Sequence, residues 1–106
     1  MNYVDKKIAL KYLANSEKLF NKVKDSFLNS YKNAVEDINY FCNTNNIDEL
    51  YRYIHSIKGI SLNIGSMILY EDSEAVLEKI KKEAKLPSLE QFIHTLRNVY
   101  YELSNL

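Results

Sequence analysis

The sequence is poor in residues that break helices or cross-link chains. It has two glycines, one proline, one cysteine and no tryptophan in 106 residues. Few turn-forming residues and no strand-like alternation between turns argue against a β-rich fold and indicate an all-helical chain. The single cysteine, Cys42, cannot form an internal disulfide, which fits a reducing compartment such as the cytoplasm. The length suits one domain, residues 1–106, with a core of its own.

The sequence also lacks an excess of charge of either sign. Lysine plus arginine and aspartate plus glutamate each total 14, so the formal net charge is zero. Binders of nucleic acid or of membrane surfaces carry a basic excess, so neither partner is expected. No apolar run reaches the roughly 18 residues of a membrane span, and the N-terminus lacks the apolar core of a signal peptide. We therefore expect a cytoplasmic protein.

Metal and nucleotide motifs are missing too. The two histidines, His55 and His94, lie far apart, and no cluster of His, Cys or carboxylate residues has metal-ligand spacing. No glycine-rich phosphate loop is present. We expect no metal, no cofactor and no ability to phosphorylate itself from ATP.

What the sequence does contain is apolar residues that recur every three or four positions, the period of a helix with one buried stripe. This spacing predicts a short helix over about 6–13 and four longer ones over about 16–43, 46–65, 66–86 and 88–106. Four longer helices with short turns predict an antiparallel up-down-up-down four-helix bundle with a short extra N-terminal helix. A break in the second helix near 29–30 is an alternative of lower weight.

Capping residues stand at the expected starts of these helices. A short polar side chain just before a helix accepts hydrogen bonds from its first N–H groups. Asn46 with Glu49, and Ser88 with Gln91, also have the spacing of a capping box. The expected caps are Asp5, Asn15 or Ser16, Asn46, Ser66 and Ser88.

The expected helix over 46–65 carries a histidine beside its apolar stripe. His55 is off the stripe, and Tyr51, Lys58, Gly59 and Leu62 lie near it at spacings of three, four or seven residues. A glycine inside a helix costs about 1 kcal/mol relative to alanine. Gly59 lies one turn after His55 on the same face, so its missing side chain leaves room for a second macromolecule to approach the histidine. Lys58 supplies a cation near the ring. An imidazole with these neighbours is suited to attack a phosphoryl group, carry it as a phosphoramidate and pass it to another acceptor.

The pattern His-x-x-Lys-Gly followed by Asn-Ile-Gly resembles the histidine-containing phosphotransfer (HPt) domain of two-component phosphorelays. The resemblance covers the whole chain, and its motif is fairly specific because five residues occur together with the stop that follows them. The matching residues are His55, Lys58, Gly59, Ser61, Asn63, Ile64 and Gly65.

The resemblance implies that His55 accepts a phosphoryl group from the aspartyl phosphate of a receiver domain and passes it to another receiver aspartate. Lys58 would neutralise charge on the group in transit. The partners implied are response-regulator receiver domains, a hybrid sensor histidine kinase, or both, and magnesium would belong to the receiver. The chain would be a monomeric phosphoryl carrier without kinase activity of its own, and whether it counts as an enzyme stays open. Two alternatives are a receiver-docking bundle without transfer and an HPt domain excised from a hybrid kinase.

The family often places a Gln or Glu on the next helix to hold the inner nitrogen of the imidazole. Here that position falls on Leu77, so Glu78 or Glu74 could serve instead, with Glu78 preferred because it is nearer in sequence. The alternative is that neither does and that water takes this role. Ile60 and Leu62 also replace small residues of the family pattern. A bulkier, more apolar surface near the histidine is therefore expected.

Several of these residues have a second interpretation. Tyr51 and Leu62 either form an apolar docking patch or are covered by an adjacent helix, and the sequence does not decide between the two. Gly59 could serve close packing against a neighbouring helix, although its place on the histidine face favours access. His94 heads a similar run, but Asn98 replaces the glycine there. We interpret His94 as an ordinary exposed histidine.

Overall fold

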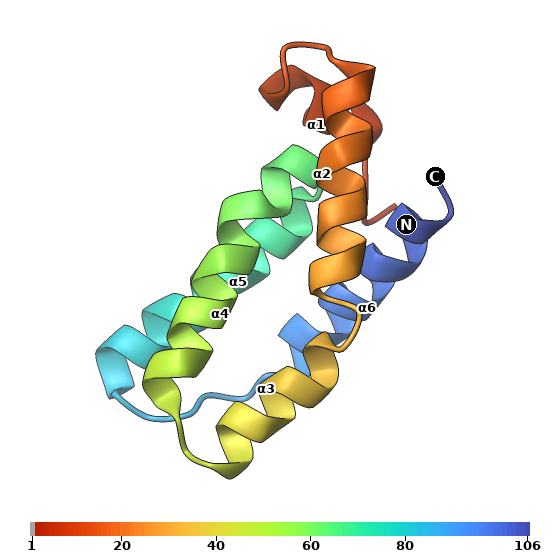
Figure 1. Ribbon diagram of the computed structural model, residues 1–106. Coiled ribbons are helices and arrows are strands. Elements are labelled where there is room, and N and C mark those ends of the chain that lie inside the picture. The colour runs from red at the N-terminus through yellow and green to blue at the C-terminus, as the bar shows by residue number, and fades with distance from the viewer. Residues whose placement is uncertain (1) are drawn as a thin grey trace.

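The computed structural model describes residues 2–106 and is all-helical (Figure 1). Within that range the chain forms six α-helices and one 3-10 helix and no strand, which confirms the all-helical prediction. The helices are α1 (Lys6–Tyr12), α2 (Glu17–Ser30), α3 (Ala34–Asn43), α4 (Ile47–Ser61), η1 (Leu62–Ile64), α5 (Met67–Glu83) and α6 (Glu90–Ser104).

Four of the expected N-cap residues cap their helices. In each, a side-chain oxygen accepts a hydrogen bond from a backbone N–H two or three residues further on. The histidine helix α4 therefore starts where the sequence predicts it. The capping residues are Asp5 for α1, Ser16 for α2, Asn46 for α4 and Ser66 for α5.

The capping box expected at the start of α6 is wrong. Leu89, not Ser88, is the N-cap, and no side chain caps this helix. The amide of Gln91 instead points at a polar cluster between α5 and α6, 3.2 Å from Thr95 Oγ1. The buried Thr95 hydroxyl donates to Asp72 Oδ2 over 2.6 Å. The Gln91 amide is also 3.5 Å from Asp72 Oδ2, so it contacts α5 and does not cap α6.

The single long helix expected over 16–43 is also wrong. It is interrupted at 31–33, just after the lower-weight alternative at 29–30. A side chain from a distant helix bonds a carbonyl at the interruption. The hydroxyl of Tyr100 in α6 donates to the carbonyl of Leu28 over 2.8 Å, and that carbonyl would bond the N–H four residues on in a continuous helix.

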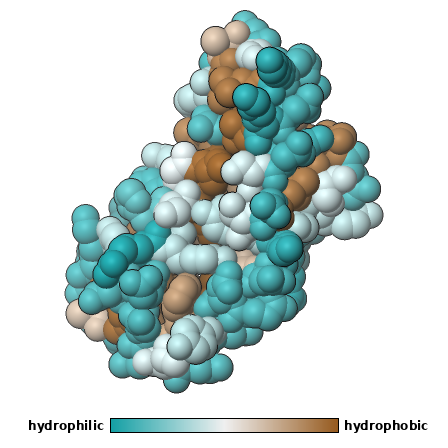
Figure 2. Space-filling model, in the orientation of Figure 1, coloured by the Kyte–Doolittle hydropathy of each residue, from teal (hydrophilic) through white to brown (hydrophobic). Residues whose placement is uncertain are grey.

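The helices pack through the stripes that the sequence predicts. Helix α4 lies along α5, α5 along α6, α3 against α4 and α2 against α6, while α1 and α2 contact η1 (Figure 1). Figure 2 shows hydrophilic residues over most of one face, with apolar residues in separate small groups. The largest fully buried side chains include Phe20, Phe27, Ile38, Leu50, Ile54, Ile57, Ile64, Leu69, Phe92, Val99 and Leu103.

The N-terminal segment ties two ends of the fold together. The backbone N–H groups of Tyr3 and Val4 both donate to Glu102 Oε1 in α6, over 2.8 and 3.0 Å. The next N–H, that of Asp5, donates to the carbonyl of Gly65 over 2.8 Å. Gly65 has a φ of 86° and ends the turn after α4, as the sequence predicts. This segment therefore fixes the end of the helix that carries His55.

Candidate functional site

His55 lies on the outer side of α4. Its neighbours Ile54 and Ile57 are fully buried and hold the helix against the core, whereas His55 itself is exposed. Residues one turn before and one turn after it share its side of the helix because an α-helix repeats every 3.6 residues. The buried stripe thus sets the direction in which the imidazole points.

A shallow depression of about 240 Å³ runs between α4 and α5 at this place. It brings together five of the seven site residues that the sequence indicates, from two separate helices. The other two, Gly59 and Leu62, do not line it. Its lining residues are Tyr51, His55 and Lys58 of α4, and Glu74, Leu77, Glu78 and Lys81 of α5.

The aromatic ring of Tyr51 lies alongside the imidazole. The two ring centroids are 6.3 Å apart and the planes differ by 19°. Tyr51 is half-buried and lies one turn before His55, so it supports one face of the imidazole. Within residues 2–106 no side chain is within hydrogen-bond distance of a His55 ring nitrogen. The expected hydrogen bond from the inner ring nitrogen of His55 to Glu78 or Glu74 therefore stays a prediction.

Lys58 reaches across to α5. Its Nζ is 3.3 Å from Glu74 Oε2 and 5.2 Å from the centroid of the Tyr70 ring. The lysine side chain is 26% exposed and the glutamate side chain 47% exposed, so this is a partly shielded ion pair. The carboxylate of Glu74, a candidate for holding the imidazole, is thus engaged by the lysine instead.

Gly59 faces open space. A Cβ added there would meet no heavy atom within 4 Å outside its own helix turn. Close packing against a neighbouring helix therefore does not account for this glycine. Tyr51 and Leu62 are each half-buried, so an adjacent helix covers neither of them completely.

Lys81 is a lining residue that the sequence interpretation missed. It lies in the last turn of α5, where a positive charge complements the negative end of the helix dipole. A signal was nevertheless present, because Lys81 is four residues after Leu77 and three after Glu78 and so shares their side of the helix. The depression therefore holds two lysines and two glutamates around one histidine.

His94 is exposed on α6 and does not line this depression. The Tyr3 ring meets its imidazole edge-on, with centroids 6.3 Å apart, and the Tyr3 hydroxyl is 3.4 Å from His94 Nε2. The amide of Asn98 donates to the His94 carbonyl over 2.8 Å. His94 lines another depression, of about 430 Å³, in which Arg97 takes the place that Lys58 has beside His55. Asn98 follows it, where α4 has the open Gly59.

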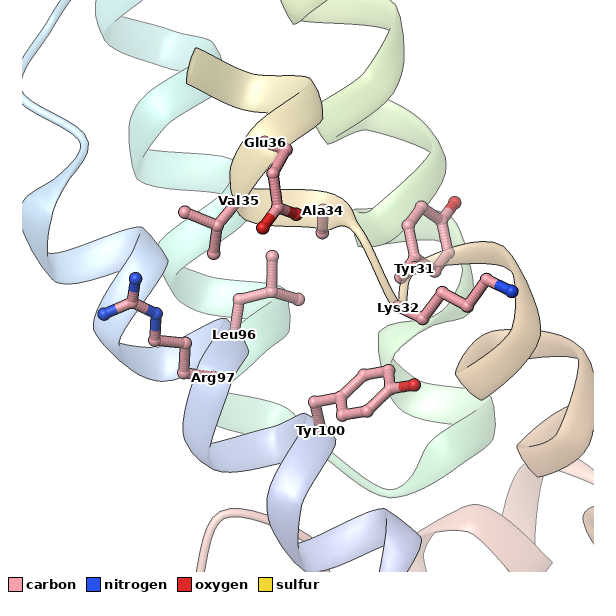
Figure 3. Close-up of a pocket in the computed structure, with 8 residues that line it drawn as sticks. All are labelled: Tyr31, Lys32, Ala34, Val35, Glu36, Leu96, Arg97 and Tyr100. Carbon is pink, nitrogen blue, oxygen red and sulfur yellow. The ribbon is translucent and has the colours of Figure 1, made fainter. Parts of the chain in front are cut away.

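A further depression, of about 260 Å³, lies where α2 breaks into α3 (Figure 3). Figure 3 shows Ala34 and Val35 of α3 opposite Leu96 of α6, with Tyr100 below them. Tyr31, Lys32, Glu36 and Arg97 complete its lining. It contains neither histidine nor cysteine, so it is a poorer candidate for nucleophilic chemistry than the depression at His55.

Among residues 2–106 no three His, Cys, Asp or Glu side chains gather so as to hold a metal ion. No helix in this range combines the length and the apolar character needed to cross a membrane.

The chain was compared with protein-family models, curated proteins and solved structures, and none of them matches it.

Proposed function

We propose that this chain is a histidine phosphotransfer protein of the HPt type. His55 accepts a phosphoryl group from a receiver aspartyl phosphate and passes it to the aspartate of another receiver. The observation that carries the proposal is the depression between α4 and α5, where an exposed histidine shares one lining with Lys58 and Lys81. An exposed nucleophile in a depression that also contains two cations suits a phosphoryl anion.

The transfer proceeds in two balanced steps. In the first, the unprotonated ring nitrogen of His55 attacks phosphorus, the N–P bond forms and the P–O bond to the receiver carboxylate breaks. The carboxylate leaves with the electron pair of that bond, and the imidazole becomes positively charged. In the second step an aspartate oxygen of another receiver attacks phosphorus and the N–P bond breaks. By the resemblance, the attacking nitrogen is Nε2, and magnesium together with its acidic ligands belongs to the receiver.

The neighbours of His55 take separate roles. Lys58 and Lys81 neutralise the phosphoryl oxygens, which carry the developing charge during transfer. Tyr51 supports the face of the imidazole by stacking. Glu78, an exposed residue in the lining of the depression, would turn toward the imidazole during transfer, accept a hydrogen bond from its inner nitrogen and fix the tautomer that attacks.

The receiver docks on the outer side of α4. Tyr51, Gly59 and Leu62 form this docking surface, and the open space at the glycine lets a second backbone approach the histidine closely. The fold that presents it is an up-down-up-down four-helix bundle, in which α2 and α3 are one interrupted helix and α1 is the short extra helix. The chain acts as a monomer in the cytoplasm, with receivers and a hybrid sensor kinase as partners.

The test is phosphoryl uptake from a phosphorylated receiver, with His55→Gln as the variant and His94→Gln as the matched control. We expect wild type and His94→Gln to gain one acid-labile phosphoryl group by mass spectrometry, and His55→Gln to gain none while keeping its helical circular dichroism. ATP alone should label none of the three proteins. Label retained in His55→Gln would refute the assignment of the nucleophile. Receiver binding without uptake by wild type would show a docking bundle that does not transfer.

A further inference from the structure

We propose that Glu74 is a gate on the phosphoryl-binding lysine. It is a positioning residue that holds Lys58 in an ion pair at rest and is displaced when a phosphoryl anion arrives at His55. The inference rests on the function proposed above and adds to it a residue that regulates access to the same site.

The geometry around the ammonium group of Lys58 carries this inference. Glu74 Oε2 is 3.3 Å from Lys58 Nζ, and the Tyr70 ring centroid is 5.2 Å from it. Tyr70 and Glu74 are four residues apart on α5, so they lie one above the other on one side of that helix. Together they form a cradle for the ammonium, which belongs to α4. The lysine is therefore not free at rest.

The charges of the depression point the same way. Lys58 and Lys81 supply two positive charges, and Glu74 and Glu78 supply two negative ones, so the lining is neutral at rest. A phosphoryl group carries up to about two negative charges near neutral pH. It can gain the Lys58 ammonium only in competition with the Glu74 carboxylate, which repels it as well.

The two arms of the cradle respond differently to this competition. The Glu74 side chain is 47% exposed and can turn into solvent without burying its charge. The Tyr70 ring is uncharged, does not repel the anion, and still supports the ammonium through a cation–π contact. Because the ion pair is partly exposed, its restraint is modest, and breaking it changes rates severalfold rather than by orders of magnitude.

The experiment uses two small reagents that attack the same ring. Phosphoramidate is anionic: His55 attacks its phosphorus, the P–N bond to the amine breaks, ammonia leaves and the ring releases its proton. Diethyl pyrocarbonate is neutral and acylates the imidazole. Phosphorylation is followed by ³¹P NMR and acylation by ultraviolet absorbance. His94→Gln protein serves as the parent throughout, so that only His55 reports.

In this parent, Glu74→Gln should raise the rate with phosphoramidate by about threefold to fivefold. It should leave the rate with diethyl pyrocarbonate unchanged. Glu71→Gln is the matched control. It removes the same charge one turn earlier on α5, from an exposed residue that forms no ion pair within residues 2–106. Its rate should match the parent, and Glu74→Asp, which keeps the carboxylate, should fall between the parent and Glu74→Gln.

A Lys58→Met background provides the decisive check, because a gate on Lys58 has nothing to hold there. In that background Glu74→Gln should no longer raise the phosphoramidate rate. Equal phosphoramidate rates for parent and Glu74→Gln, including no reaction in either, would overturn the gate. So would an equal increase with both reagents or an equal increase in Glu71→Gln. Failure of the proposed function is a separate result, namely no transfer from a phosphorylated receiver to wild-type His55.

Discussion

Gly59 and Gly65 lie six residues apart, and the structure predicts opposite responses to alanine at the two positions. At Gly59, inside α4, nothing lies within 4 Å of an added Cβ, so only helix propensity changes. Alanine should raise the free energy of unfolding by about 0.8–1 kcal/mol. For a domain of this size that corresponds to a melting temperature higher by about 4–8 °C.

At Gly65 two costs combine. Its φ of 86° is left-handed, and a Cβ would also clash with the carbonyl oxygen of Asp5. The left-handed conformation alone costs a non-glycine residue about 1–2 kcal/mol, so Gly65→Ala should lower the free energy of unfolding by more than about 2 kcal/mol. Urea denaturation followed by circular dichroism measures both variants. A destabilised Gly59→Ala protein with an unchanged m-value would refute the conclusion that this glycine faces open space.

The functional half of the prediction uses a larger side chain at the same place. Gly59→Leu should stay folded and keep the wild-type rate with phosphoramidate, because a small donor does not need the cleared surface. Transfer from a phosphorylated receiver should slow, mainly through weaker docking, since the receiver backbone can no longer approach His55. Wild-type kinetics with the receiver would show that the open glycine has no part in docking.

Two further predictions concern Glu78 and Tyr53. Glu78→Ala should slow transfer from a receiver by about twofold to tenfold, because it removes one partly exposed hydrogen bond to the imidazole. Rapid-quench kinetics would measure this rate, and an unchanged rate would show that Glu78 has no role at the site. Burial, and secondarily a hydrogen bond to the Asp37 carboxylate, raise the pKa of Tyr53 well above its ordinary value of 10.0. As the pH rises, Tyr53 therefore loses its proton in the unfolded chain before it does so in the folded protein. The free energy of unfolding should fall above about pH 10, and in urea denaturation Tyr53→Phe should show a smaller fall. An equally steep decline in the Phe variant would contradict this origin.

The features that could be predicted from the sequence are the local ones. The side chain of Asn46 accepts a hydrogen bond from an N–H only three residues away, so the start of α4 depends on a short stretch of sequence. The buried stripe through Ile54 and Ile57 likewise lies on one helix. The break after α2 is less local. The sequence offers a break at 29–30 only as the lower-weight alternative, and at the observed break the Leu28 carbonyl accepts a hydrogen bond from Tyr100, 72 positions away.

The candidate site also has one part that the sequence predicts and another that it does not. The grouping of Tyr51, His55 and Lys58 follows from helical spacing alone. Which side chains of α5 face them depends on the rotation of that helix, and one residue of uncertainty turns a side chain by about 100°. The pairing of Glu74 with Lys58 was therefore beyond the sequence, because it needs the relative rotation of two helices.

The contacts of the N-terminal segment indicate the order in which parts of the chain fold. Tyr3 and Val4 bond Glu102 across nearly the full length of the chain, whereas α4 and α5 are neighbours joined by a short turn. Closing the longer loop costs more chain entropy, so the helical hairpin can assemble early and the two ends meet only when the intervening helices are in place. Slow hydrogen exchange at the amides of Tyr3 and Val4 would thus mark a molecule in which every helix has docked.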